Sequence, residues 1–210
     1  MKTKEELICE FVEVGKTLYD RGYATGSAGN MSVLLPDNTV AATPTGSCLG
    51  KLDPDNLSIV DMDGNLLSGP KATKEVLFHL ALYKNNPDHK AVVHLHCSYC
   101  TAYSCISGLN KDSVFEPITP YLVMRMGDVP LISYYKPGSP NLTKDIGALA
   151  NKHNAFLMAN HGMITCGKNL NEALCNAEEL EASCKLYFIL RGTNEPIKYL
   201  TADEINELRK

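Results

Sequence analysis

A hydrophobic run that ends in two alternating histidines constrains this chain more than any other feature. Residues 91–96 read Ala-Val-Val-His-Leu-His, and such an apolar run predicts a buried β-strand. Because side chains two residues apart in a strand project to the same face, His94 and His96 can direct both imidazoles into one space. Two converging imidazoles at the end of a buried strand indicate a metal site more strongly than a lone histidine does.

Two other segments carry the residue types that would complete such a site. Glu75 lies near the start of a predicted helix, and His161 follows another predicted strand and precedes a glycine. Catalytic zinc typically has three protein ligands and one open position. Imidazole with a carboxylate also suits Mn²⁺ and other divalent first-row ions, so the metal's identity stays open. We predict that Glu75 and His161 join His94 and His96 around one divalent ion.

The remaining histidines and the cysteines have simpler interpretations. His79 lies four residues after Glu75 on the same helix face, where it either belongs to the core or supports the metal ligands from behind. His89 and His153 fall in polar connections and are predicted to lie at the surface. Cys97 and Cys100 form a C-x-x-C, but no second pair at similar spacing favours a structural zinc site. Without a secretion signal, most of the eight cysteines are expected to be reduced, buried thiols.

Two loops rich in glycine and hydroxyl residues are typical of an anion cradle. They are residues 26–30 (Gly-Ser-Ala-Gly-Asn) and 45–47 (Thr-Gly-Ser), and Thr73 adds a hydroxyl at a predicted helix start. Backbone N–H groups and helix N-termini favour phosphate. Tight turns need the same residues, so these loops alone leave both interpretations open.

The order of predicted elements is strand-rich early and mixed later, which favours an α/β or α+β sandwich over a doubly wound sheet. The region 116–140 is rich in prolines and tyrosines and contains one predicted strand. The predicted helices are 3–22, 73–85, 102–106, 142–152, 171–190 and one starting at Thr201; the predicted strands are 31–35, 39–43, 57–61, 66–67, 91–96, 129–132, 156–159 and 163–166.

Length and charge narrow the class of protein. The 210 residues suit one domain spanning 1–210. The net charge of −4, with dispersed basic residues, argues against a nucleic-acid partner. No apolar run approaches the ~20 residues that span a bilayer, and the N-terminus lacks an apolar signal core. We therefore expect no membrane association and a cytoplasmic location.

Taken together, five motifs resemble those of the class II aldolase family, which includes fuculose-phosphate aldolase and ribulose-phosphate epimerase. The resemblance extends over residues 22–190. It implies a single-domain three-layer α/β/α sandwich with a mostly antiparallel central sheet, assembled as a homotetramer with active sites at subunit interfaces. The motifs are Gly-Ser-Ala-Gly-Asn-Met-Ser (26–32), Thr-Pro-Thr-Gly (43–46), Lys-Glu-x-x-x-His (74–79), His-Leu-His (94–96) and Asn-His-Gly (160–162).

The resemblance also implies roles for individual residues. The histidines of the metal set, His94, His96 and His161, would bind one zinc ion per subunit. Glu75 would be the acid/base and can also bind the metal. The residues that match the family's phosphate site are Asn30, Thr45, Gly46 and Thr73.

Further segments resemble a decarboxylase branch of this family. They are residues 52–54, 72–75, 118–127 and 134–138. This likeness implies decarboxylation of a 3-oxo-tetronate 4-phosphate, a four-carbon sugar acid phosphate, to dihydroxyacetone phosphate and carbon dioxide. Lys74 stands where the sugar aldolases usually have serine, which indicates an additional anion, such as a carboxylate, in the pocket. A sugar-phosphate aldolase or 4-epimerase is the alternative. A non-catalytic module like the adducin head is a third, which the complete set of His and Glu residues disfavours.

The chemistry is consistent with these assignments. When carbon dioxide leaves a 3-oxo acid, the electron pair of the broken bond moves onto the ketone oxygen and gives an enediolate. A Lewis-acid metal can stabilise that negative charge. Glu75, with a pKa that we expect the pocket to raise, would deliver the proton to carbon. Tyr121 matches the tyrosine that, in the aldolases, reaches in from a neighbouring subunit to handle the leaving aldehyde's proton. In a decarboxylase that task disappears, and Tyr121 would only orient the substrate.

Overall fold

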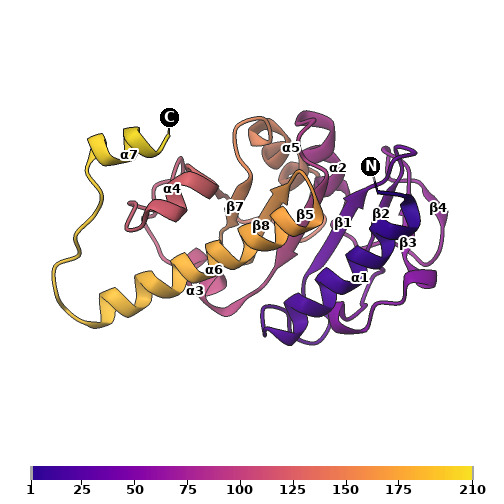
Figure 1. Cartoon of the computed structure of the whole chain (residues 1–210), viewed down its shortest axis with the longest axis horizontal. Helices are drawn as coiled ribbons and strands as arrows, with labels where there is room; N and C mark the ends of the chain where they lie inside the picture. The colour runs from indigo at the N-terminus through magenta and orange to yellow at the C-terminus, as the bar shows by residue number, and fades with distance from the viewer. Residues whose placement is uncertain (1, 210) are drawn as a thin grey trace.

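The computed structural model describes residues 2–209 and is built around one mixed sheet (Figure 1). The strand order is β4-β3-β2-β1-β5-β8-β7-β6, and every neighbouring pair is antiparallel except β6 with β7. The sheet is therefore mostly antiparallel, as expected. The strands are β1 (Asn30–Leu34), β2 (Val40–Ala42), β3 (Ser58–Val60), β4 (Leu66–Ser68), β5 (Ala91–Leu95), β6 (Leu131–Ile132), β7 (Ala155–Met158) and β8 (Gly162–Gly167).

Helices cover both faces of the sheet and complete a three-layer sandwich (Figure 1). One apolar core lies between the sheet and the layer of α1 (Lys4–Asp20), α3 (Ser98–Ser104) and α6 (Leu170–Gly192). A second core lies between the sheet and α2 (Val76–Asn85) with α5 (Pro140–Leu149). Outside these layers are α4 (Pro120–Met126), α7 (Ala202–Leu208) and two short 3₁₀ turns, η1 (Leu49–Lys51) and η2 (Pro54–Asn56).

Strand alternation in β5 decides where its histidine points. Val93 belongs to the core under α1 and α6, whereas Val92 belongs to the core under α2 and α5. His94 shares the face of Val92 and lies edge-on to Phe78 of α2. In the sheet His94 lies opposite Asn30 of β1 on one side and Ile164 of β8 on the other. The end of β5 therefore presents its imidazole beneath the start of α2.

Several helix boundaries agree with the capping signals. Thr3 accepts a hydrogen bond from the backbone of Glu6, whose carboxylate accepts one in return, so α1 begins at the predicted capping box. The same reciprocal pair, formed by Thr201 and Glu204, starts α7. Along α6 the predicted apolar face is buried, namely Ala173, Ala177, Leu180 and Cys184.

Several boundaries differ from the prediction. The short helix predicted at 102–106 is α3, which begins four residues earlier, at Ser98, and ends at Ser104. The helix expected from Thr73 begins only at Val76, because the Thr73 N–H donates to the Thr43 carbonyl and extends the sheet pairing instead. The region 116–140, for which only a strand was predicted, also contains α4, whose first residue is Pro120, a favourable position for a residue that lacks an N–H. The helix expected at 142–152 starts earlier, again at a proline, Pro140.

Two burial predictions also need correction. His89 is 1% exposed rather than at the surface, because its turn folds the ring inward between Asn86 and Asn154. Cys9 and Cys105 are exposed, so the expectation of buried thiols holds for only part of the set; the buried ones are Cys97, Cys100, Cys166 and Cys184.

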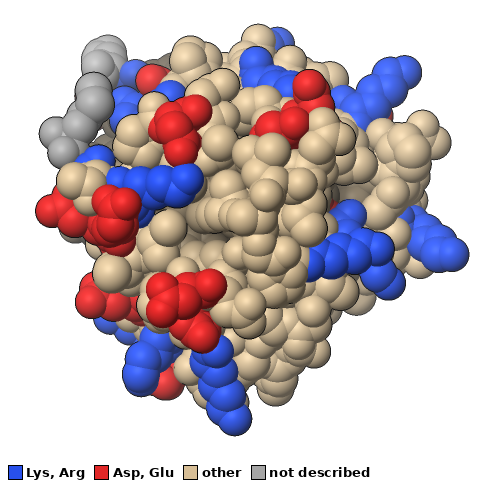
Figure 2. Space-filling model, turned by 90° about the vertical axis from the view of Figure 1, so that its right-hand side faces the viewer, with Lys and Arg blue, Asp and Glu red and all other residues tan. Residues whose placement is uncertain are grey.

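Figure 2 shows how charge is distributed on one face of the molecule, and the helices show whether a segment could cross a membrane. On the face shown in Figure 2, acidic and basic side chains are interspersed around an uncharged area, and no basic stripe crosses it. Over residues 2–209, no helix combines the length and the apolarity that a membrane crossing requires.

Candidate active site

Four side chains from three separate segments meet where β5 ends. His94 ends its apolar run, His96 follows two residues later, His161 lies in the turn between β7 and β8, and Glu75 caps α2. One ligand atom from each lies within 4.8 Å of all the others. The His94 and His96 Nε2 atoms are 2.9 Å apart. Glu75 Oε2 lies 3.3 Å from His94 Nε2, and Glu75 Oε1 lies 3.6 Å from His161 Nε2. The set predicted as metal ligands is therefore brought together.

The turn that carries His161 depends on its neighbours. Asn160 adopts a positive φ of 55°, a conformation that asparagine tolerates better than most residues. A Cβ on Gly162 would lie 2.3 Å from the Leu95 carbonyl oxygen, so only glycine lets β8 start this close to the end of β5. This close approach puts the His161 ring 4.8 Å from that of His96.

The donor set fits a divalent cation. His94 Nδ1 donates to the Met163 carbonyl at 2.7 Å, which leaves the Nε2 lone pair directed at the cluster. Glu75 Oε1 is buried without a hydrogen-bond partner, an arrangement that is unfavourable unless a cation or proton compensates it. Ligands at ~2.1 Å from a tetrahedral zinc lie roughly 3.4 Å from each other, which resembles the observed spacings.

The electrostatics of the cluster correct one expectation. Burial raises the pKa of the Glu75 carboxyl, but the proximity of His94, the hydrogen bond from Asn30 and the proximity of His161 outweigh it, and the pKa lies well below its usual value. The pocket therefore favours the carboxylate, not the acid. Burial and the neighbouring His94 lower the pKa of His96 to about 4, and they lower that of His161 as well. Neutral imidazoles and a carboxylate are the forms that bind metal.

The predicted anion-binding loops also come together. The Thr45 N–H donates to the Lys71 carbonyl at 2.9 Å, and the Thr45 hydroxyl donates to the Ala72 carbonyl at 2.6 Å. This pairing brings the 43–46 loop beside residues 71–74. Of the predicted residues, Thr45, Gly46 and Lys74 are exposed and Thr73 is buried.

The side chain of Asn30 is engaged differently from the other predicted phosphate-site residues. Its amide nitrogen donates to Glu75 Oε2 at 2.8 Å, and its amide oxygen is 2.7 Å from His79 Nε2. Sequence reasoning assigned Asn30 to phosphate and left His79 undecided. The link between them was missed, because the Glu-x-x-x-His spacing gives the helix face but not the strand residue that meets it.

Tyr121 stands apart from the cluster within one chain. It lies on α4 with 61% of its surface exposed, and α4 packs against α6 and α7. Over residues 2–209, no hydrogen bond or aromatic contact joins Tyr121 to Glu75 or to the three histidines.

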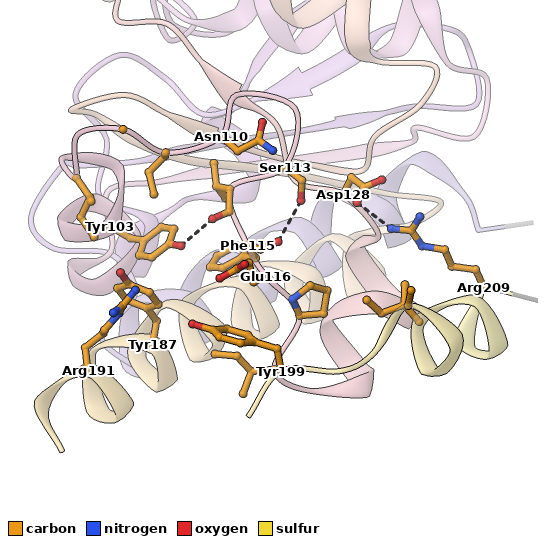
Figure 3. Close-up of a pocket in the computed structure, with 18 of the residues that line it drawn as sticks. Tyr103, Asn110, Ser113, Phe115, Glu116, Asp128, Tyr187, Arg191, Tyr199 and Arg209 are labelled. Carbon is orange, nitrogen blue, oxygen red and sulfur yellow. Dashed lines mark hydrogen bonds and ion pairs between the residues drawn. The ribbon is translucent and has the colours of Figure 1, made fainter. Parts of the chain in front are cut away.

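A cavity and a cysteine cluster lie outside this histidine cluster. A cavity of about 650 Å³ lies between the end of α6, α7 and the segment 106–118, and includes none of the clustered histidines (Figure 3). Its arginines are already engaged, since Arg209 pairs with Asp128 and Arg191 lies over the Tyr187 ring. Cys97, Cys100 and Glu181 also lie within 4.8 Å of one another, but the Glu181 carboxylate already accepts the N–H groups of Tyr99 and Cys100 at the start of α3.

Comparison with known proteins decides the family. The sequence pattern of the Class II Aldolase and Adducin N-terminal domain matches residues 9–188. The chain belongs to this family. Over 208 residues it is 57% identical to the 3-oxo-tetronate 4-phosphate decarboxylase of Escherichia coli K12, a match that covers 99% of the chain and 97% of that protein.

A second curated relative is less similar, and a solved structure is about as similar as the first. The L-fuculose phosphate aldolase of Methanococcus maripaludis C5 is 34% identical over 188 residues, which cover 90% of this chain and 99% of that enzyme. Among solved structures, YgbL of Escherichia coli superposes with a TM-score of 0.95 at 56% identity, covering 98% of this chain and 99% of its own. These likenesses agree with the class II aldolase sandwich expected from the sequence.

Proposed function

We propose that this class II aldolase family member is a metal-dependent decarboxylase of a 3-oxo-tetronate 4-phosphate. The observation that carries the proposal is the 57% identity, over almost the whole chain, to a protein of that name. The clustered Glu75, His94, His96 and His161 support it, because decarboxylation of a 3-oxo acid needs a sink for negative charge beside the ketone. The whole chain, 1–210, would act as one domain in the cytoplasm, within four-carbon sugar acid catabolism.

The metal set would hold one Zn²⁺ per subunit, with Mn²⁺ or another divalent ion as the alternative. When bound, such an ion supplies Lewis acidity that stabilises the charge developing on the substrate's ketone oxygen. The protein's part is to keep the His96 and His161 imidazoles neutral by burial. The hydrogen bond from His94 Nδ1 to the Met163 carbonyl fixes one of them in the ligating tautomer.

The chain's other residues would bind and orient the substrate. The Thr73 hydroxyl and the backbone at Gly46 would hold the phosphate, and the exposed Lys74 ammonium would pair with the carboxylate. Thr45 and Asn30, predicted with them, would form the wall of this pocket, because Thr45 donates to Ala72 and Asn30 is engaged with Glu75 and His79. The bond between carbons 1 and 2 then breaks. Carbon dioxide leaves, and the electron pair moves to the oxygen on carbon 3. Because the carboxylate departs from beside Lys74, this lysine would distinguish the reaction from aldol cleavage.

Glu75 would complete the reaction by giving a proton to carbon 2. Its lowered pKa means that it starts as a carboxylate, so it must first take up a proton from solvent. The unpartnered Oε1 is the oxygen free to carry that proton.

The test is to incubate the metal-loaded protein with each enantiomer of 3-oxo-tetronate 4-phosphate and to follow both products. Equal amounts of carbon dioxide and dihydroxyacetone phosphate would support the proposal, and the faster enantiomer would identify the substrate. Turnover of a sugar phosphate without carbon dioxide would contradict it. That result would favour an aldolase or epimerase, the alternative that the 34% identity to L-fuculose phosphate aldolase keeps open.

We further propose that the active unit is a homotetramer with sites between subunits. The 61% exposure of Tyr121 and of Met124 on the same helix supports a neighbour at this surface. Tyr121 of one subunit would then orient the substrate bound to another. Light scattering would test the assembly: a mass near four chains is expected, and an active monomer would contradict it.

A further inference from the structure

A continuous chain of buried hydrogen bonds runs from Glu75 into the interior. Asn30 Nδ2 lies 2.8 Å from Glu75 Oε2, and Asn30 Oδ1 lies 2.7 Å from His79 Nε2. His79 Nδ1 lies 2.7 Å from the Ser32 hydroxyl, which is 2.6 Å from the Tyr83 hydroxyl. All five residues are less than 10% exposed, and Ser32 and His79 are fully buried. This hydrogen-bonded chain therefore lies beneath the protein surface, with Glu75 at its active-site end.

Two sequence periodicities produce this chain. Glu75, His79 and Tyr83 are each four residues apart, so they follow one face of α2 and the residue that caps it. Asn30 and Ser32 are two apart on β1, so they share one face of the sheet. The helix face rests on the strand face, and the polar residues interleave.

The direction of every hydrogen bond in this chain follows from Glu75, the acceptor at one end. A carboxylate can only accept, so the Asn30 amide nitrogen must face Glu75 and the amide oxygen must face His79. His79 Nε2 therefore carries the hydrogen. Burial lowers the pKa of His79 to about 3, so the ring is neutral and its Nδ1 accepts from Ser32. Burial also raises the pKa of Tyr83, which keeps its hydrogen to donate to Ser32.

The two carboxylate oxygens of Glu75 therefore have different surroundings. Oε2 is held by Asn30, whereas Oε1 has no hydrogen-bond partner and lies on the side of His161. A glutamate side chain held at one oxygen loses most of its rotational freedom. The free oxygen is then aimed at one place before substrate arrives, which is the preorganisation that fast proton transfer requires.

We propose that His79, fixed by Ser32 and Tyr83 and acting through Asn30, is a positioning residue that aims Glu75 Oε1 at the reacting carbon and the cation. This inference rests on the proposed function of Glu75 and extends it to residues that touch neither substrate nor metal. It predicts effects on turnover and on metal affinity, with little effect on substrate binding.

The first test uses paired substitutions at His79. His79→Gln retains an amide donor that can reach Asn30, whereas His79→Leu has similar volume and no donor. We expect His79→Leu to lower kcat about 10- to 100-fold, the usual range for residues that orient metal ligands, with KM changed less than about threefold. His79→Gln should recover most of kcat. Equal losses in both variants, or a loss confined to KM, would overturn the proposal.

A matched control and a milder variant separate positioning from folding. His89→Gln removes another buried histidine, distant from the chain of bonds, and should leave kcat unchanged. If His79→Leu fails to fold, Ser32→Ala and Tyr83→Phe decide, since each deletes one hydroxyl. Lower kcat in both, with an unchanged KM, would support the proposal, and wild-type kcat in both would overturn it.

A second readout does not depend on the reaction. Zinc affinity, measured by competition with a chromophoric chelator, should fall in His79→Leu and in Glu75→Gln. In the double variant it should fall no further than in Glu75→Gln alone, because His79 acts through Glu75. Additive losses would overturn the positioning role. The zinc affinities of the two single variants and the double variant can be non-additive even if neither the wild type nor any variant releases carbon dioxide. In that case the proposed reaction fails while the positioning role stands.

Discussion

The two ends of β5 each have a buried histidine, and only one of them forms a candidate site. His89, just before the strand, is 1% exposed and hydrogen-bonded to Asn86 and Asn154. His94, at the other end, is fully buried and lies beside Glu75 and two more imidazoles. Burial and a hydrogen-bonded ring are therefore common to structural and functional histidines. What differs is the convergence of several ligand atoms on one point.

The largest effect is expected from removing a ligand. His94→Ala should abolish stoichiometric zinc retention and reduce turnover below detection, because the lost ring is the one that lies within 3.3 Å of both Glu75 and His96 and the remaining ligands lose that shared neighbour. Zinc content after dialysis and product release are the measurements. His89→Ala is the control and should keep one zinc per chain. If His94→Ala retained one zinc per chain, His94 would be no more a metal ligand than His89, and the two ends of β5 would not differ in this respect.

Glu75→Gln should have the next largest effect. The amide keeps the shape of the side chain but cannot carry a proton, so turnover should fall at least about 100-fold, the usual general acid/base contribution. The three histidines should still bind zinc, although more weakly. Near-normal turnover would mean that Glu75 does not act as the acid.

The pH dependence of stability should reflect the buried rings. Folded His79 and His96 have pKa values of about 3 and about 4, whereas unfolded histidine titrates near 6.5. Between about pH 6.5 and pH 4 the unfolded chain therefore binds more protons, and the free energy of unfolding falls as the pH falls. The melting temperature of the metal-free protein should decrease over this range, and less steeply in His79→Gln. A melting temperature that rises from pH 7 to pH 5 would contradict these values.

Tyr121→Phe should have the smallest effect. If Tyr121 only orients the substrate, the loss of its hydroxyl should weaken turnover several-fold without abolishing it, as for one ordinary hydrogen bond. Zinc content should stay at the wild-type level. Complete loss of activity with the metal intact would assign this tyrosine a direct part in proton transfer.

Sequence patterns predicted the parts of the fold that local rules govern. The His-x-His alternation placed both imidazoles on one side, and the capping boxes at Thr3 and Thr201 gave the starts of α1 and α7. The predictions that failed depended on contacts distant in sequence. Thr73 is drawn into pairing with the 43–46 loop, which no helix-capping rule anticipates. His89 is buried because Asn154, far along the chain, supplies a partner.

The same limit applies to the candidate site. The metal set was evident from residue type and spacing, but the charge balance at Glu75 was not, because burial and attraction to His94 have opposite effects on its pKa. The Glu75–Asn30–His79 chain was also hidden, since it joins a helix face to a strand face. Only the packed structure shows which residues of two periodic faces meet.

The most direct test of the account is anomalous scattering at the zinc edge from crystals of the zinc-loaded protein. We expect one peak per chain, at about 2.0–2.2 Å from the ligating nitrogens and oxygen, the usual zinc distances. The ligands should be Nε2 of His94, His96 and His161, with the Glu75 carboxylate adjacent. A peak at Cys97 and Cys100 instead, or no peak at the histidines, would contradict the central claim that the end of β5 is the metal centre.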